Sequence, residues 1–142
     1  MHTIIKVRWV ILKDSKVFLL QWAPWKKFML PWWKQEKNET IKDTFYREMF
    51  EETWIKAEIE KFLWFKEYIN QKWEITIQFL FKVKNIYDFE NIDKTKCSHW
   101  YEWIQWGFYD LDYLKENNLD YPQDLEEIIN TINFDYNYNY FI

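Results

Sequence analysis

Three glutamates, at positions 48, 51 and 52, lie close enough in the sequence to act as a group. Because Glu51 and Glu52 follow Glu48 by three and four residues, a helix would place all three carboxylates on one face. Like charges at this spacing repel by about 0.2–0.5 kcal/mol per pair, and a divalent cation would reverse that sign. Mg²⁺ prefers oxygen ligands and substrate phosphates. The cluster therefore predicts a metal site for phosphate chemistry, unless the glutamates are simply good helix formers on a solvated face.

Two more charged residues stand in a fixed relation to this cluster: Glu39 lies upstream and Arg47 directly precedes Glu48. With them, the segment Trp33–Ile55 resembles the Nudix box, the signature of enzymes that hydrolyse a nucleoside diphosphate linked to another group. Aligned on this chain, that box reads Gly, five residues, Glu, seven residues, Arg-Glu, an apolar residue, any residue, Glu-Glu, any residue, Gly and an apolar residue. The residues that match in register are Glu39, Arg47, Glu48, Glu51, Glu52 and Ile55. Both box glycines are replaced by tryptophan, Trp33 and Trp54.

The resemblance implies a role for each matching charged residue. Glu51 and Glu52 are expected to bind the metal ions, and Glu48 is expected to act as a ligand or as the general base. Arg47 is expected to orient the glutamates by ion pairing, the alternative being an ordinary surface ion pair. Glu39 is expected to anchor the preceding loop to the helix. The implied cofactor is Mg²⁺, with Mn²⁺ as a substitute.

Two residues outside the charged core of the box are further candidates. Trp32, if glycine stands there in the natural protein, is expected to offer its backbone carbonyl to the metal. Glu102 precedes a predicted strand and is a candidate substrate-binding residue, because related enzymes supply an acidic metal ligand or base from this region. A glutamate in a solvated loop is the alternative. On sequence alone His99 is a surface residue or a substrate contact, and Cys97 lacks a partner histidine motif for nucleophilic chemistry.

The chain holds 1 glycine and 11 tryptophans, although proteins average about 7% glycine. Several tryptophans stand where positive φ is expected, a conformation that glycine adopts without a steric cost. Trp54 follows the last predicted helical residue, where helices often close in a left-handed conformation. Trp73 lies in the turn Asn70–Trp73 between two predicted strands, and Trp25 follows Pro24. Since a bulky residue is an outlier at positive φ, these positions conflict with the sequence as written.

A reassigned codon explains this conflict. Some bacteria read UGA as glycine, whereas a common alternative translation table reads UGA as tryptophan, so translation with the wrong table would turn glycines into tryptophans. The heavy use of Lys, Asn, Ile, Tyr and Phe suits an A+T-rich gene. Trp106 is expected to be genuine and Trp103 is left open. The alternative is a genuinely tryptophan-rich protein, either a degenerate Nudix fold or a binding module. The positions predicted to be glycine in the natural protein are Trp9, Trp22, Trp25, Trp32, Trp33, Trp54, Trp64, Trp73 and Trp100.

Length and charge bound the class of protein. The 142 residues suffice for one domain with its own core, predicted over residues 1–134 with an Asn/Tyr-rich tail at 135–142. The net charge of −4 argues against nucleic acid as the main partner. One cysteine excludes an internal disulfide and fits a reducing compartment, and no apolar run approaches the ~20 residues of a membrane span. We expect a cytoplasmic monomer or homodimer with a small nucleotide substrate and no membrane contact.

The hydrophobic pattern predicts an α/β domain. Strands are predicted at Thr3–Leu12, Val17–Gln21, Phe28–Leu30, Ala57–Ile69, Glu74–Val83 and His99–Phe108. Helices are predicted at Ile41–Thr53, Asp110–Leu114 and Pro122–Ile132, the first with Thr40 and Asp43 as a capping box. Asn85–Ser98 is predicted to be a loop. This mixed sheet with helices on both sides agrees with the α/β/α sandwich and the strand-loop-helix-loop catalytic motif that the Nudix resemblance implies.

The resemblance implies Mg²⁺-dependent hydrolysis of a diphosphate linkage in a nucleoside di- or triphosphate derivative. Water would attack one phosphorus and give two phosphate-containing products, or release pyrophosphate from a triphosphate. The extra motifs of the coenzyme A and isopentenyl diphosphate isomerase branches are missing, as is the proline-rich array of some ADP-sugar enzymes. The sequence therefore names no particular nucleotide. The alternative is a catalytically inactive Nudix-fold module that binds a nucleotide or regulates without cutting it.

Overall fold

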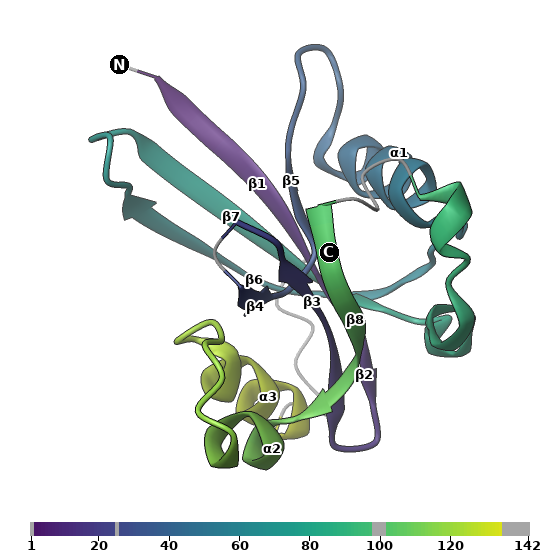
Figure 1. Ribbon diagram of the computed structural model, residues 1–142. Coiled ribbons are helices and arrows are strands. Elements are labelled where there is room, and N and C mark those ends of the chain that lie inside the picture. Colours follow the sequence, from purple (N-terminus) through teal and green to yellow (C-terminus); the bar gives the residue numbers. More distant parts are fainter. Residues whose placement is uncertain (1, 25, 98–101, 135–142) are drawn as a thin grey trace.

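The computed structural model describes residues 2–24, 26–97 and 102–134 (Figure 1). Its strands are β1 (Thr3–Val10), β2 (Leu12–Lys13), β3 (Lys16–Trp22), β4 (Lys27–Met29), β5 (Trp32–Lys34), β6 (Ile59–Ile69), β7 (Ile75–Val83) and β8 (Trp103–Asp110). Its α-helices are α1 (Ile41–Thr53), α2 (Leu111–Glu116) and α3 (Leu125–Phe134), and 3₁₀ helices η1 (Ile86–Asn91) and η2 (Lys94–Lys96) follow β7. Within these described ranges, no helix has the length and apolar character that crossing a membrane requires.

Two sheets form the centre of the fold (Figure 1). In the first, with strand order β5-β1-β7-β6, β1 runs parallel to β7 and antiparallel to β5, and β6 runs antiparallel to β7. The second sheet is antiparallel, since β3 pairs with β2, β4 and β8. Side chains alternate along a strand, so β1 presents Val7 and Trp9 to one face of the first sheet and Arg8 and Val10 to the other. Each face can therefore bury a helix.

Helix α1 covers one face of the first sheet. Phe45 and Met49 of α1 are fully buried and pack in one cluster with Val7 and Trp9 of β1 and Phe81 of β7. Burying an apolar side chain of this size stabilises a fold by about 1.5–3 kcal/mol. This contact fixes the helix that carries the box glutamates against the sheet.

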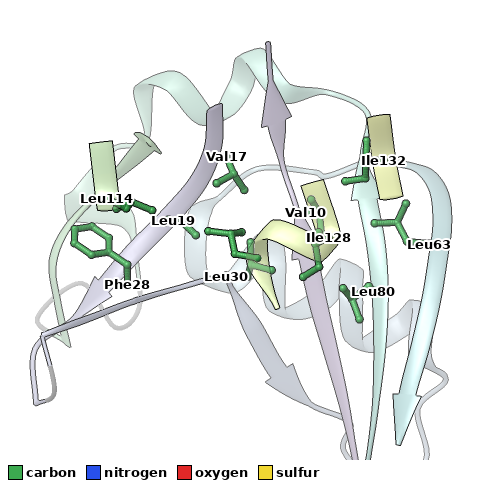
Figure 2. Close-up of a cluster of buried hydrophobic side chains, with 11 residues drawn as sticks. Val10, Val17, Leu19, Phe28, Leu30, Leu63, Leu80, Leu114, Ile128 and Ile132 are labelled. Carbon is green, nitrogen blue, oxygen red and sulfur yellow. The ribbon is translucent and has the colours of Figure 1, made fainter. Parts of the chain in front are cut away.

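Helix α3 covers the opposite face (Figure 2). Leu125, Ile128 and Ile132 of α3 are buried in a second cluster with Val10 of β1 and Leu80 of β7. The remaining buried members of this cluster come from both sheets, their connections and α2: Val17, Leu19, Phe28, Leu30, Leu63 and Leu114. With helices on both faces of a mixed sheet, the predicted α/β class is confirmed.

Helix α1 has the bounds that the sequence predicts. The Thr40 hydroxyl accepts a hydrogen bond from Asp43 N, and the Asp43 carboxylate accepts one from Thr40 N, which completes the capping box. At the other end Trp54 adopts the left-handed conformation and donates its N–H to Phe50 O at 2.8 Å. Local capping thus defines both ends of α1.

The structure corrects three expectations about local structure. Trp32 and Trp33 follow Pro31 outside the predicted strands and are expected in the loop before α1, but they belong to β5 and pair with Arg8 and Val7 of β1. The predicted loop after β7 contains η1 and η2. Helix α3 begins at Leu125 and not at Pro122, because the chain first makes a turn in which Leu125 N donates to Pro122 O at 3.1 Å. The expectations for Trp25, for residues 98–101, which include His99 and Trp100, and for the tail 135–142 lie outside the described residues.

Candidate active site

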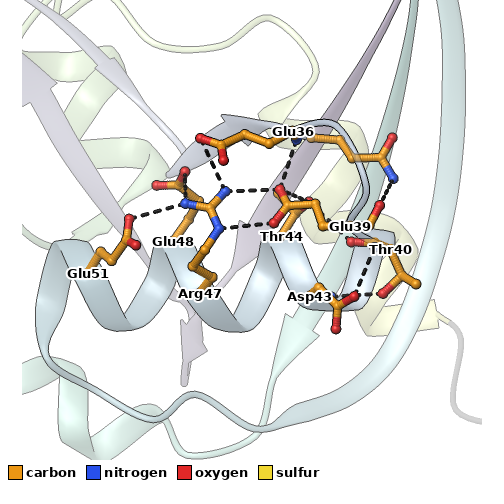
Figure 3. A network of polar contacts seen from close by, with 9 residues as sticks. Glu36, Glu39, Thr40, Asp43, Thr44, Arg47, Glu48 and Glu51 are labelled. Carbon is orange, nitrogen blue, oxygen red and sulfur yellow. Dashed lines mark hydrogen bonds and ion pairs between the residues drawn. The ribbon is translucent and has the colours of Figure 1, made fainter.

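Arg47 lies at the centre of the charged cluster on α1 (Figure 3). Its Nε and Nη2 donate to the two carboxylate oxygens of Glu39, each at 2.9 Å. Its Nη1 donates to Glu48 Oε1 at 2.7 Å and to Glu51 Oε2 at 3.2 Å, and Nη2 lies 3.6 Å from Glu36 Oε1. A guanidinium presents its donors in a fixed planar fork. One side chain therefore orients three box glutamates at once.

Glu39 joins the loop after β5 to α1. Its Oε1 accepts hydrogen bonds from Thr44 Oγ1 at 2.7 Å and from Glu36 N at 2.8 Å, and its backbone O accepts one from Gln35 Nε2 at 2.7 Å. The hydrogen bonds from Arg47 are the largest influence that lowers the pKa of Glu39 to about 2. The carboxylate is thus held ionised between loop and helix, which is the arrangement that an anchoring role requires.

Glu48 and Glu52 lie one helical turn apart on α1, with only 7% and 1% of their surfaces exposed, whereas Glu51 is exposed. Burial raises the pKa of Glu48, and the nearby charges of Glu51 and Glu52 act in the same direction, while Arg47 opposes them. Carboxylates gathered in this way favour the approach of a cation. Arg47 supplies one positive charge to the cluster.

Cys97 lies near this cluster but lacks the environment of a nucleophile. Burial raises the pKa of its thiol, and the negative charges of Glu52 and Asp93 raise it further. The reactive form of cysteine is the thiolate, which needs a lowered pKa. The structure places Cys97 in a buried position, and its surroundings agree with the expectation that it is not a nucleophile.

The three box glutamates offer oxygen donors only, which is the chemistry that Mg²⁺ prefers. Across the described ranges, however, no three acidic, histidine or cysteine side chains converge as a ready-made metal site. Glu48 and Glu51 turn towards Arg47 instead (Figure 3). The donor set fits Mg²⁺ in kind, and binding of the ion would exchange contacts with Arg47 for contacts with the metal.

A cavity of about 400 Å³ opens beside Glu48. Its carboxylates come from Glu36, Glu48 and Glu102, which the fold brings together from the β5–α1 loop, from α1 and from the start of β8. Its apolar wall includes Leu20 of β3 and Trp103 of β8. The predicted candidate Glu102 therefore lines the same cavity as the box residue Glu48.

Three of the tryptophans predicted to be glycine line this cavity as well: Trp22, Trp32 and Trp33. Lys6 Nζ lies over the ring of Trp32, 4.2 Å from the ring centroid. The aliphatic wall could not be recognised from the sequence, because apolar residues of β3 and β4 look like ordinary core residues. Lys34 of β5 also lines the cavity and could not be told from any other lysine. Glu36, which contacts Arg47, lies inside the box segment and could have been found as one more charged residue of that loop.

Neither a family model nor any curated protein matches this sequence. Solved structures do match. A Nudix hydrolase from Nitrosomonas europaea is 17% identical at a TM-score of 0.75, with 98% of this chain and 94% of that chain covered. A MutT Nudix hydrolase from Burkholderia pseudomallei is 17% identical at a TM-score of 0.67, with 93% and 99% covered. A MutT protein from Methanosarcina mazei Go1 is 21% identical at a TM-score of 0.64, with 94% and 96% covered. These likenesses show that the chain has the fold of the Nudix hydrolases.

Proposed function

We propose that this chain hydrolyses a diphosphate linkage in a nucleoside di- or triphosphate derivative with the help of Mg²⁺. One observation carries the proposal: Glu48, which Arg47 connects to Glu39 and Glu51, lines a cavity of about 400 Å³. Pockets for small ligands measure about 300–1,000 Å³, so a nucleoside fits beside the carboxylates. We place the reaction in the cytoplasm, because the single thiol suits a reducing compartment.

Each residue of the cluster has a task in this reaction. Glu48 faces the cavity and is placed to bind the ion or to take a proton from the attacking water. Glu51 and Glu52 complete the set of oxygen ligands. Arg47 orients these carboxylates, and Glu39 holds Arg47 and the loop in place. When bound, Mg²⁺ would neutralise the negative charge of the diphosphate and lower the pKa of the attacking water.

Product analysis with a nucleotide panel tests the proposal. Purified protein is incubated with nucleoside triphosphates and with nucleoside diphosphates linked to sugars or to a second nucleoside, and the products are separated by anion-exchange chromatography. We expect at least one compound to be split at its diphosphate linkage, with activity lost in EDTA and restored by excess Mg²⁺. Absence of product from every compound, with a folded protein, would contradict the proposal.

The alternative is a Nudix-fold module that binds or senses a nucleotide without cutting it. One observation favours it: Arg47 already holds Glu48 and Glu51, and the indoles of Trp32 and Trp33 line the cavity beside them. Saturable binding of a nucleotide without product, measured by calorimetry in the presence of Mg²⁺, would support this alternative.

We further propose that most of the tryptophans are glycines in the natural protein, encoded by UGA. Trp54 and Trp73 carry this proposal, because their φ angles are 60° and 61°. A residue with a Cβ enters this left-handed region at a cost of about 1–2 kcal/mol. Their side chains are 58% and 83% exposed, so little packing offsets that cost. Glycine satisfies both positions without strain.

Trp9 has one feature that agrees with the same proposal, although its packing against Phe45 in the α1 cluster opposes it. Its side chain is fully buried, and in the part of the chain that the structure describes its indole N–H has no hydrogen-bond acceptor. A buried donor of this kind costs about 1–3 kcal/mol. Its ring also stacks on that of Trp33, with centroids 4.6 Å apart. The two positions are therefore coupled, and a change at one requires repacking at the other.

The mass of the tryptic peptide Phe28–Lys34, isolated from the source organism, checks the reassignment at the box. We expect a mass that corresponds to glycine at both Trp32 and Trp33. A mass that corresponds to two tryptophans would overturn the proposal for the box. The gene gives an independent control, since UGG codons at positions 32, 33 and 54 would exclude the reassignment there.

A further inference from the structure

A second cavity, of about 280 Å³, lies at the end of the first sheet where β1 begins (Figure 1). Three segments that are distant in the sequence build its wall: the start of β1, the end of β5 with the residue that follows it, and the β6–β7 turn. The lining residues are His2, Thr3, Ile4, Ile5, Lys34, Gln35, Lys72 and Glu74. None of these lining residues is a tryptophan, so the wall keeps its side chains if glycine stands at the positions discussed above.

The register of the first sheet brings the three segments together. Strand β1 lies between β5 and β7. Lys34 pairs with Lys6, and Thr3 pairs with Ile75, so the end of β5 and the start of β7 flank the start of β1. Because neighbouring strands are about 4.8 Å apart, the two flanking strands lie about 10 Å from each other. Lys34 and Lys72 therefore reach the cavity from opposite sides of β1.

Hydrogen bonds within the β6–β7 turn hold Lys72 and Glu74 in place. Asn70 Oδ1 accepts from Lys72 N at 2.9 Å and from Glu74 N at 3.0 Å. Asn70 Nδ2 donates to Glu74 Oε1 at 3.2 Å, and Asn70 N donates to Glu74 O at 2.9 Å. The turn thus presents Lys72 from a fixed backbone, and Asn70 engages one oxygen of the Glu74 carboxylate.

The side chains of this wall carry an excess of positive charge, although the net charge of the chain is −4. Two lysines, Lys34 and Lys72, stand against one carboxylate, and the imidazole of His2 adds a ring N–H donor. A lysine ammonium is a compact charge with three donors, and it binds phosphate oxygens as a point charge. The wall therefore favours a compact anion over a neutral or cationic ligand.

Gln35 connects the second cavity to the charged cluster on α1. Its backbone N donates to Ile5 O at 2.9 Å, which holds it against β1, and its side-chain Nε2 donates to Glu39 O at 2.7 Å. The Glu39 carboxylate in turn accepts two hydrogen bonds from Arg47. A ligand that contacts Gln35 therefore acts, through one residue, on the loop that anchors Arg47.

We propose that the second cavity binds inorganic pyrophosphate, with one phosphate group at Lys34 and the other at Lys72. The inference rests on the proposed hydrolysis, which releases pyrophosphate from a nucleoside triphosphate, and it adds a separate site for that product. A diphosphate has an anionic group at each end and engages both lysines at once, whereas orthophosphate or sulfate engages one. A volume of about 280 Å³ is just below the range of about 300–1,000 Å³ for larger ligands and suits this small anion. Bound pyrophosphate acts on the box loop through Gln35.

Calorimetric titration with pyrophosphate in EDTA tests the inference without metal or catalysis, since the glutamates of α1 then repel the anion. We expect one site that binds pyrophosphate more tightly than orthophosphate or sulfate at equal ionic strength. Lys72→Gln should weaken this binding about tenfold, the low end of the cost of a lost charge-assisted hydrogen bond. Glu74→Gln keeps an acceptor for Asn70 but removes a negative charge, so it should tighten the binding. Lys84→Gln, exposed and outside both cavities, is the matched control and should bind as the unchanged protein does.

Amide chemical shifts of ¹⁵N-labelled protein give a second readout, which tests the connection to the box loop. Pyrophosphate should shift the signals of Gln35 and Glu36, and Lys72→Gln should abolish these shifts at the same ligand concentration. Absence of binding in EDTA, equal binding in Lys72→Gln, or no preference for pyrophosphate over sulfate would each overturn the inference and leave the proposed hydrolysis intact. Binding with the expected opposite effects at positions 72 and 74, in a protein that cuts no nucleotide, would retain the site and reject the proposed function.

Discussion

Replacement of Glu52 by glutamine is expected to lower kcat by about 10²- to 10³-fold, the typical cost of removing one group that stabilises charge in the transition state. Glu52 is 1% exposed and lies on α1 one turn beyond Glu48. Glutamine keeps the size and shape of the side chain, so the packing of α1 is preserved while a negative charge is lost. The measurement is steady-state hydrolysis of the best nucleotide from the panel at saturating Mg²⁺.

The free energy of unfolding of the same variant separates chemistry from folding. Because Glu48 and Glu52 carry like charges at helical spacing, the substitution should leave stability unchanged or raise it by about 0.2–0.5 kcal/mol. Glu58→Gln, at an exposed position outside α1, is the matched control and should retain full activity. Near-normal turnover in Glu52→Gln would contradict the proposed role of the box carboxylates in the mechanism.

The ends of α1 could be predicted from the sequence because the signals are local. Thr40 and Asp43 form the capping box within four residues, and the residue after Thr53 takes the left-handed conformation that closes a helix. No distant contact is needed for either feature. The charged cluster follows from the same regularity, since helical spacing alone places Arg47 beside Glu51.

Strand β5 and the cavity could not be predicted in the same way. Trp32 and Trp33 become a strand because they pair with Arg8 and Val7, more than twenty positions earlier in the chain. The cavity depends on how the second sheet packs beside α1, and its wall residue Leu20 ends the continuous apolar run Val17–Leu20, which is typical of any strand that is buried on both faces. Long-range pairing and the space between packed layers leave no local signature, whereas caps and helical spacing do.

Substitution of both Trp54 and Trp73 by glycine is expected to raise the free energy of unfolding by about 2 kcal/mol. Each change releases about 1–2 kcal/mol of left-handed backbone strain, and the greater freedom of glycine in the unfolded chain takes back about 0.4–1 kcal/mol. The lost contacts are small, because Trp54 touches Phe50 at 5.3 Å between ring centroids and Trp73 is 83% exposed. Urea denaturation of the single and double variants measures the effect.

Two controls tie this gain to the backbone and not to removal of an indole. Trp54→Ala removes the same ring but keeps a Cβ, so the strain remains and no gain is expected. Trp103→Gly removes a buried ring from a position at negative φ and should cost about 3–5 kcal/mol, as for other buried aromatic residues. Equal effects of alanine and glycine at position 54 would show that the indole, not the φ angle, sets the stability. If glycine raises the free energy of unfolding at positions 54 and 73 but lowers it at position 103, stability follows the φ angle of each position. This is the result expected if glycine stands at both turns in the natural protein.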